Sequence, residues 1–393
     1  MEYQESHPWL TFDFKLNDLE SIDLIHIGEA ISKCEHVQWT PLAPAVAQEL
    51  GKIFLAKGAH STTSIEGNTL SEEEVRKSIE GELKLPRSQA YLDTEVKNVA
   101  RVFQTIAQEC ATGTLPELSV ERIHFFNSQI LADLELEDHV SPGKFREGSA
   151  IVGNVYRGAP ASDIDYLMDK FVTYINSLTA IDDERYKQPA AITAAILAHL
   201  YFVWIHPYYD GNGRTARLIE FQLLAQAGIP IISAHLLSDF YNRTREVYYR
   251  VLIDTSRMKN GQPVGPAPFL SYAVEGFVDN LRNQVDLIRG FLISVTWTNY
   301  IHEHFQGTPV SKIQRRRRQL ILAMDPTKAY TKTEAIDINS DTVRAYANED
   351  IRTITRDLNA LTKMNLLTKE GNNYKPNITL LTQFFPIRHH STE

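Results

Sequence analysis

The stretch HPYYDGNGRTAR, residues 206–217, constrains the fold and chemistry of this 393-residue chain more than any other feature. Its central residues, 211–213, are Gly-Asn-Gly, which lets the backbone approach a ligand closely. Arg214 and Arg217 follow at helical spacing, so they share one face of a helix that begins here. Two arginines in a first helical turn are unfavourable, because a helix N-terminus already carries partial positive charge. The pattern therefore predicts an anion site in which backbone N–H groups and both arginines cradle phosphates.

Two further residues of the stretch indicate catalysis rather than simple anion binding. Asp210 is a carboxylate beside the expected phosphates, and Mg²⁺ prefers such oxygen ligands. His206 stands at the rim, and an imidazole has an unperturbed pKa near neutrality, as a general base requires. The stretch thus predicts a base, a metal ligand and an anion site together. A glycine-rich loop with a solvated arginine pair between two core helices is the alternative.

The whole string resembles the signature of the Fic family, HxFx(D/E)GNGRxxR, at every position but one. Tyr208 stands where that family usually has phenylalanine. The resemblance implies protein adenylylation (AMPylation), in which AMP passes from ATP to a Ser, Thr or Tyr hydroxyl of a target protein or of the enzyme itself. His206 would take the hydroxyl proton, and Asp210 would hold Mg²⁺. The phosphates of ATP would be bound by Gly211, Asn212, Gly213, Arg214 and Arg217.

A second motif, HSTTSIEGNTL, ends a helix predicted over residues 44–66. Thr62 and Glu66 stand four residues apart on one helix face, and Gly67 has the place of a glycine that closes a helix. The pattern resembles the (S/T)xxxE(G/N) inhibitory motif of the Fic family. That resemblance implies that Glu66 pairs with Arg217 and blocks the place of the ATP γ-phosphate. A solvated glutamate at a polar helix end is the alternative.

Two short β-like runs around a Gly-Asn turn follow the segment SPGKFRE, which resembles the approach to the flap of the Fic family. The edge of such a hairpin would pair with an extended target segment. A surface hairpin without a partner is the alternative. The expected docking residues are Ile151, Val152, Gly153, Asn154, Val155 and Tyr156.

Tyr248 and Tyr249 resemble a tyrosine pair near the adenine end of the site in that family, and simple aromatic packing is the alternative. His199, two helical turns before His206, is interpreted as a core histidine. No cysteine pair, HExxH motif or histidine triad accompanies it, which argues against a zinc site.

The C-terminal part of the chain differs from the rest in charge. Residues 310–393 hold 14 Lys and Arg against 9 Asp and Glu, or +5, so the formal −9 of the whole chain leaves −14 for the remainder. Predicted helices followed by a hairpin at LLTKEGNNYKP resemble a winged helix-turn-helix, whose second helix can enter a DNA major groove. A protein-contact or dimer module is the alternative. The RRRR run at 315–318 indicates a nucleic-acid patch or a solvated face.

These patterns predict a mostly α-helical chain with a small hairpin flap and a C-terminal winged helix. The expected parts are an irregular N-terminal arm over 1–43 without chemistry, a catalytic domain over 44–300, and a winged-helix domain over 310–393. The catalytic domain includes the inhibitory helix at about 61–67.

Two alternatives to AMP transfer stay open at this stage. The same site could hydrolyse AMP from a modified target, with Glu66 positioning water, or the chain could be a non-enzymatic DNA-binding regulator acting through residues 310–393. The two cysteines, Cys34 and Cys110, give no disulfide framework and fit the cytoplasm. No signal peptide and no apolar run of membrane-spanning length is expected, so no membrane partner is predicted. A homodimer is also left open.

Overall fold

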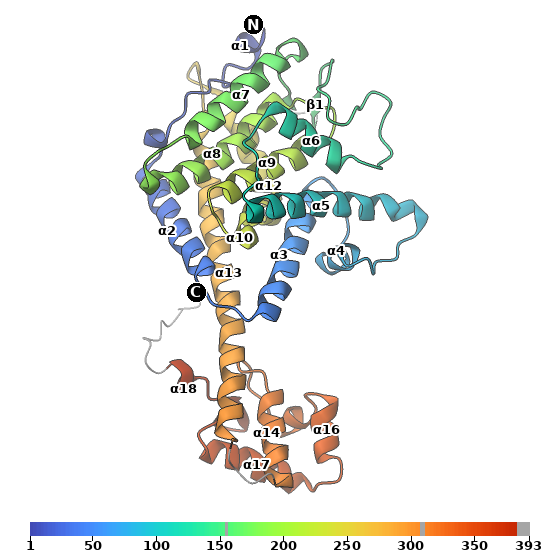
Figure 1. Ribbon diagram of the computed structural model, residues 1–393, viewed down its shortest axis with the longest axis vertical. Helices are drawn as coiled ribbons and strands as arrows, with labels where there is room; N and C mark the ends of the chain where they lie inside the picture. Colours follow the sequence, from blue (N-terminus) through green and yellow to red (C-terminus); the bar gives the residue numbers. More distant parts are fainter. Residues whose placement is uncertain (154–155, 307–310, 383–393) are drawn as a thin grey trace. The chain divides into compact units, whose positions relative to one another are not determined.

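The structure is a computed structural model that describes residues 1–153, 156–306 and 311–382 (Figure 1). It is mostly helical, which confirms the predicted fold class. The chain divides into two compact units, Met1–Val285 and Asp286–Glu393, and the division lies inside the long helix α13 (Ala267–His304). The boundaries predicted from the sequence, at 43/44 and between 300 and 310, differ from this division and stay predictions.

The first unit consists mainly of helices, which two short antiparallel hairpins interrupt. Its helices before α13 are α1 (Tyr3–Ser6), α2 (Ser21–Gln38), α3 (Pro44–Ile65), α4 (Glu72–Ile79), α5 (Ala90–Thr112), α6 (Val120–Ile130), α7 (Ile164–Thr179), α8 (Glu184–Ile205), α9 (Asn212–Gln226), α10 (Ile231–Ala234), α11 (Leu236–Arg243) and α12 (Arg245–Thr255). Short 3₁₀ turns are η1 (Leu16–Asp18), η2 (Arg87–Gln89) and η3 (Ala161–Asp163). The hairpins are β1 (Ile151–Val152) with β2 (Tyr156–Arg157), and β3 (Met258–Lys259) with β4 (Gln262–Pro263).

Helix α8 forms the core of this unit because its sequence is apolar on nearly all sides. Residues 190–202 are all buried, and several alanines among them let α7 and α9 pack closely. The expectation that no apolar run reaches the length of a membrane span was wrong for Arg185–Ile205, whose mean hydropathy is 1.4 over its most apolar window. However, 83% of that window is buried inside the protein, which is the usual state of a core helix.

The turn between α3 and α4 fixes the backbone at Glu66. Helix α3 ends at Ile65, and Gly67 follows with φ +102°, a conformation that favours glycine. The N–H groups of Gly67 and Asn68 donate to carbonyls of the last helical turn at 3.0 and 3.1 Å, which is the pairing of a Schellman cap. Helix α4 then begins with a capping box at Ser71. Glu66 therefore leaves the helix end in a defined direction.

The N-terminal arm was predicted to be irregular, and this prediction was wrong. The arm contains the 18-residue helix α2. Its buried positions recur at helical spacing, a signal that is present in the sequence. The usual start signal is missing, because Glu20 at the N-cap makes no side-chain cap bond. The buried positions are Asp23, Ile27, Ala30, Cys34 and Val37.

The second unit contains the end of α13 and a compact set of helices followed by a hairpin. Its further elements are α14 (Lys312–Ala323), α15 (Lys332–Ile336), α16 (Ser340–Tyr346), α17 (Ile351–Lys363), β5 (Leu367–Glu370), β6 (Asn373–Pro376) and α18 (Thr379–Thr382). Strands β5 and β6 pair antiparallel, and Trp297, Leu320, Leu358 and Tyr374 belong to one buried core. This order of elements is the one predicted for a winged helix, and assignment to that class stays a prediction.

The RRRR run, residues 315–318, is partly a core feature of the second unit. Nε of Arg316, which is 7% exposed, lies 2.7 Å from Asp357 Oδ2, and its Nη1 lies 2.9 Å from Glu349 Oε1. Nε of Arg317 lies 2.8 Å from the other oxygen of Asp357. These ion pairs join α14 to α17, so half of the run is neither a solvated face nor a nucleic-acid patch.

Candidate active site

The stretch 206–217 forms a tight loop between α8 and α9. His206 ends α8 with φ +52° and ψ +62°, a left-handed conformation that non-glycine residues rarely adopt. Gly211 precedes α9 with φ +78°, and a Cβ at this position would lie 3.0 Å from Nδ2 of Asn127. Helix α9 begins at Asn212, in the region that the sequence predicts. The loop therefore needs glycine at 211 and tolerates backbone strain at the expected base.

The side chain of Asn212 bonds the backbone of its own loop. Its Oδ1 accepts a hydrogen bond from the Tyr208 N–H at 3.0 Å, and its Nδ2 donates to the Tyr208 carbonyl at 2.8 Å. Asn212 is one of the residues predicted to bind the ATP phosphates. One N–H of its amide is used by the Tyr208 carbonyl, so the second amide N–H and the backbone N–H are the donors left for that role.

The first turn of α9 presents backbone N–H groups that lack a side-chain cap. The N–H groups of Asn212, Gly213 and Arg214 have no acceptor among the described residues. Such a helix N-terminus binds anions. The carboxylate of Glu66 lies over it, since a Cβ on Gly213 would be 2.1 Å from Oε1 of Glu66. The predicted anion site thus holds a carboxylate of the protein itself.

Glu66 also contacts Arg217 directly. Nη2 of Arg217 lies 2.6 Å from Oε1 of Glu66 and donates to the Thr62 carbonyl at 3.0 Å, while Nε donates to the Thr62 hydroxyl at 2.6 Å. The Arg217 side chain is fully buried, whereas that of Glu66 is 32% exposed. Nη1 of Arg217 has no acceptor in the part of the chain that the structure describes. A buried guanidinium with a free donor suits one more anionic oxygen, such as that of a phosphate.

Both members of this pair keep their charges at neutral pH. Burial alone would raise the pKa of the Glu66 carboxyl, but the Arg217 guanidinium outweighs it, and the net pKa is below its ordinary value. Burial alone would lower the pKa of Arg217, but Glu66 outweighs it, and the net pKa is raised. The contact is therefore an ion pair that seats a negative charge at the α9 N-terminus.

Arg214 has acidic partners that the sequence did not predict. Its Nη1 lies 2.7 Å from Oε1 of Glu95 on α5, and its Nη2 lies 3.1 Å from Oδ1 of Asp210. Nδ2 of Asn68 donates to the other oxygen of Glu95 at 3.0 Å. Arg214, expected to bind the ATP phosphates, is thus held by two carboxylates. No local pattern could identify Glu95, because its partner stands 119 residues away in the chain.

Asp210, the predicted magnesium ligand, has a half-exposed side chain. The Gly211 N–H and Arg214 both bond its Oδ1, at 2.5 and 3.1 Å, so Oδ2 has no partner among the described residues. Across these residues no group of three or more His, Cys, Asp or Glu could hold a metal by itself. A single carboxylate suits Mg²⁺, which usually completes its shell with phosphate and water oxygens.

One segment of the chain matches the model of a known protein family. Residues 117–224, which include most of the region from α6 to α9 and the whole loop at His206, match the model of the Fic/DOC family. The motif at Glu66 lies before the matched segment, so membership of the class with an N-terminal inhibitory helix stays a prediction.

Two curated animal proteins are similar to part of this chain. Protein adenylyltransferase fic-1 of Caenorhabditis briggsae is 28% identical over 184 residues, which are 46% of this chain and 34% of that protein. Protein adenylyltransferase Fic of Drosophila ananassae is 28% identical over 226 residues, 57% of this chain and 43% of that protein. The chain thus spans less than half the length of these relatives.

Solved structures are similar to this chain in fold. A Fic family protein from Desulfovibrio desulfuricans G20 has a TM-score of 0.52 and 18% identity, covering 89% of this chain and 95% of its own. Fic-1 of Caenorhabditis elegans, residues 134 to 508 of that protein, has a TM-score of 0.53 and 21% identity, covering 68% and 73%. At these identities the likeness shows the fold alone.

Arg146, from the SPGKFRE segment, organises the backbone around His206. This buried guanidinium donates from Nε to the His206 carbonyl at 2.7 Å, from Nη1 to the Gly148 carbonyl at 2.5 Å, and from Nη2 to the Ala159 carbonyl. Burial lowers the pKa of the His206 imidazole to about 4, and the charge of Arg146 adds to the effect. The imidazole is therefore neutral at neutral pH and can accept a proton.

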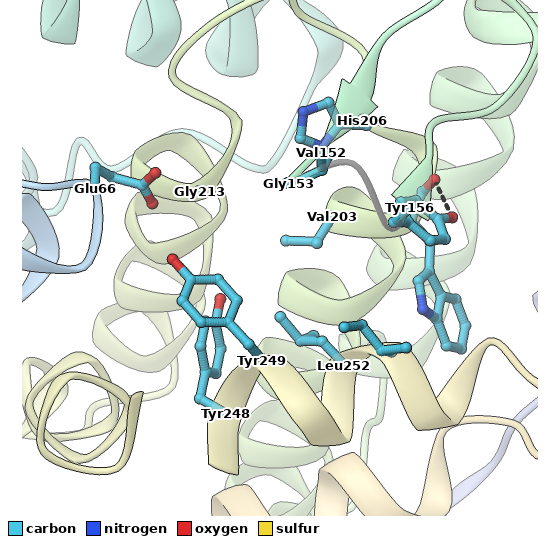
Figure 2. Close-up of a pocket in the computed structure, with 12 residues that line it drawn as sticks. Glu66, Val152, Gly153, Tyr156, Val203, His206, Gly213, Tyr248, Tyr249 and Leu252 are labelled. Atoms are coloured by element: carbon cyan, nitrogen blue, oxygen red, sulfur yellow. Dashed lines mark hydrogen bonds between the residues drawn. The ribbon is translucent and has the colours of Figure 1, made fainter. Parts of the chain in front are cut away.

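A pocket of about 380 Å³ opens beside Glu66, His206 and Gly213 (Figure 2). Figure 2 shows Glu66 on one side of this space, His206 on another, and an apolar floor from α8 and α12. The floor includes Val203 and Leu252. The space thus combines an anion site with an apolar surface, which suits a nucleotide.

Both predicted tyrosines line this pocket. Tyr249 is partly exposed, and its hydroxyl donates to the Ile65 carbonyl at 3.1 Å, at the end of the helix that carries Glu66. Tyr248 is buried, and its hydroxyl lies 2.9 Å from Nε2 of His199. His199 is completely buried with this partner, in agreement with its interpretation as a core histidine.

The hairpin of β1 and β2 stands at the position predicted for the flap. Ile151 pairs with Arg157 and Val152 with Tyr156. Val152, Gly153 and Tyr156 line the pocket, while Ile151 is 60% exposed. Two of the predicted docking residues, Asn154 and Val155, lie outside the described residues.

Proposed function

We propose that the chain transfers AMP from ATP to a hydroxyl side chain of a protein, and that Glu66 inhibits this reaction. One observation carries the proposal: an anion site at the α9 N-terminus, filled by Glu66 of the same chain, lies beside a neutral histidine in one pocket. The names of the relatives support the reaction type.

In the proposed reaction, His206 accepts the proton of the target hydroxyl as its oxygen attacks the α-phosphorus of ATP. A new P–O bond forms to the target, the bond from the α-phosphorus to the bridging oxygen breaks, and pyrophosphate leaves. The backbone N–H groups of residues 212–214 and the free donor of Arg217 stabilise the phosphate oxygens. Positioning and charge stabilisation therefore supply most of the catalysis.

The residues present fit magnesium. Asp210 would hold the ion through its open Oδ2, and Mg²⁺ when bound supplies charge neutralisation to the phosphates. Arg214 also contacts Asp210, so its guanidinium orients the carboxylate for this role.

In the proposed inhibition, the Glu66 carboxylate competes with the terminal phosphate of ATP for Arg217 and the α9 N-terminus. Two anions cannot share this space, because like charges at contact distance repel strongly. Bound ATP would then lie displaced from productive geometry, or would have to expel Glu66.

Incubation of the purified chain with ATP labelled at either the α- or the γ-phosphate tests this proposal. We expect Glu66→Gly to retain the α-label on protein at least about tenfold faster than wild type, with no retained γ-label. Glu82→Gly, in an exposed loop, is the matched control and should behave like wild type. Equal rates in wild type and Glu66→Gly would contradict the inhibition, and retained γ-label would contradict AMP transfer. Release of AMP from a modified target, with no transfer in any variant, would favour hydrolysis instead.

Helix α17 carries a basic stripe that supports a second proposal. Exposed polar side chains recur there at helical spacing, while Ile354, Leu358 and Leu361 on the opposite side are buried. The stripe consists of Arg352, Arg356, Asn359 and Lys363, and exposed Lys369 and Lys375 lie on the adjoining hairpin. Unlike Arg316, none of these cations forms an ion pair with another described residue.

We propose that this face binds duplex DNA, because unpaired cations on one helix face suit a groove and its phosphates. Fluorescence anisotropy of the full chain with a labelled duplex should give binding that weakens between about 50 and 200 mM salt. Replacing both Arg352 and Arg356 by alanine should reduce the salt slope by about two. Arg344→Ala, an exposed arginine on α16, should leave it unchanged. No binding at the low salt concentration would contradict the proposal.

A further inference from the structure

The N-terminal segment, residues 3–10, contacts the flap hairpin although the two are about 150 residues apart in the chain. Nε2 of His7 lies 2.8 Å from the carbonyl oxygen of Arg157 in β2. A carbonyl oxygen can only accept, so Nε2 carries the proton and donates. His7 is 3% exposed, and the bond is partly buried. The segment is therefore attached to the strand itself.

Trp9 extends the same contact. Its indole N–H donates to the Tyr156 hydroxyl at 3.4 Å, and that hydroxyl donates to the Trp204 carbonyl at 2.7 Å. The rings of His7 and Trp9 lie 5.0 Å apart, and both lie about 6 Å from the Tyr156 ring. Tyr156, which lines the pocket, is thus held by Trp9 and by the Trp204 carbonyl. The backbone of Tyr3 adds an anchor by donating to Asp163 at 2.9 Å.

The register of the hairpin decides which backbone groups face outward. The Gly158 N–H donates to the Ala150 carbonyl at 3.0 Å, so residues 150 and 158 are a hydrogen-bonded pair. In an antiparallel ladder such pairs alternate with pairs whose N–H and C=O groups point away from the partner strand. Ile151 and Arg157 form the next pair, so their backbone groups face outward. This agrees with the bond from His7 to the Arg157 carbonyl.

The hairpin therefore has one covered edge and one open edge. On β2 the outward carbonyl of Arg157 is bonded by His7. On β1 the outward N–H and C=O of Ile151 have no partner among the described residues, and the Ile151 side chain is 60% exposed. An unpaired strand edge accepts another extended segment by main-chain hydrogen bonds.

We propose that residues 3–10 are part of the target-docking surface: they close the β2 edge and leave the β1 edge at Ile151 as the edge on which an extended protein segment docks. This inference rests on the proposed function for the identity of the docked segment as the AMP acceptor. The closure itself is a property of the free chain. The bond from His7 covers the β2 edge, and the contacts of Trp9 help to hold the hairpin in place.

Hydrogen exchange of the full chain, followed by mass spectrometry of the peptide over residues 148–158, tests the closure without any activity. His7→Ala should speed exchange of this peptide about fivefold, because the partly buried hydrogen bond from His7 to Arg157 no longer restrains opening. His7→Gln, whose amide offers a donor at similar reach, should exchange at nearly the wild-type rate. His36→Ala, an exposed histidine on α2, is the control. Unchanged exchange in His7→Ala, or equally fast exchange in His7→Gln, would overturn the closure.

Ile151→Pro tests the open edge. Proline removes the outward N–H and leaves the β1–β2 ladder intact, as edge strands tolerate. In the Glu66→Gly background we expect this change to lower transfer of α-label to protein at least about tenfold, with ATP affinity unchanged. Ile151→Ala, which keeps the N–H, should lose much less. Equal transfer with proline would refute the β1 edge. No transfer in Glu66→Gly itself would refute the proposed function and leave the exchange result to decide the closure.

Discussion

Replacing Glu66 by glutamine should tighten the binding of ATP far more than that of ADP. Glutamine keeps the size of the side chain but removes the charge that lies over Gly213. The proposed inhibition makes this carboxylate a competitor of the terminal phosphate, which ADP lacks. The experiment is best done with His206→Ala as the common background, so that no turnover disturbs the binding measurement.

The magnitude follows from the geometry of the pair. Glu66 and Arg217 are 2.6 Å apart, and Arg217 is fully buried. A hydrogen bond to a charged group contributes about 1.5–3 kcal/mol, and the 32% exposure of Glu66 moves the value to the lower end. Displacing the carboxylate thus costs ATP about 1.5 kcal/mol, which corresponds to roughly a tenfold change in affinity.

Isothermal titration calorimetry with Mg²⁺ measures both nucleotides. We expect Glu66→Gln to lower the Kd of ATP about tenfold and the Kd of ADP less than threefold. Glu82→Gln should change neither. An equal gain for ATP and ADP would mean that Glu66 does not occupy the terminal phosphate site. No gain for ATP would refute the competition altogether.

Three further predictions concern pH and packing. The pKa of Glu66 is lowered, so its ion pair with Arg217 is lost only as pH falls below the ordinary glutamate range. The ratio of the Glu66→Gly transfer rate to the wild-type rate should therefore stay constant between about pH 5.5 and 8. Burial lowers the pKa of His235 to about 3, so the folded protein keeps this imidazole neutral while the unfolded chain binds a proton below about pH 6.5. The free energy of unfolding should therefore fall by about 2 kcal/mol between pH 7 and pH 5. In urea unfolding, His235→Phe should remove that loss, and an unchanged pH dependence would contradict the assignment. Thr62→Val removes the acceptor of Arg217 Nε and should lower the free energy of unfolding by about 2 kcal/mol, whereas a change below about 0.5 kcal/mol would mean that Arg217 finds another acceptor.

The sequence predicted those parts of the site whose residues are close together in the chain. The loop at His206, the start of α9 and the glycine turn after Glu66 all have local signals, because glycine conformation and helix ends depend on neighbouring residues. The pairing of Glu66 with Arg217 joins distant segments, and only the resemblance to a family supplied it. The structure brings these two residues together, while their inhibitory role stays a prediction.

Other parts of the site depend on tertiary packing and could not be predicted from the sequence. Glu95 and His7 each contact a residue more than 100 positions away, and nothing near them in the sequence indicates a role. The Asn212 amide could face a ligand or its own loop, and the residue type is the same in both cases. Only the contacts with Tyr208 decide between them.

The most direct test of the central claim is the double variant Glu66→Gly with His206→Ala. Its ATP affinity and its transfer of α-label to protein should be measured beside those of Glu66→Gly alone. We expect an affinity within about twofold and a transfer rate reduced at least about a hundredfold, because only the proton acceptor has been removed. Transfer at the rate of Glu66→Gly would contradict the assignment of His206 as the base, and with it the proposed reaction at this site.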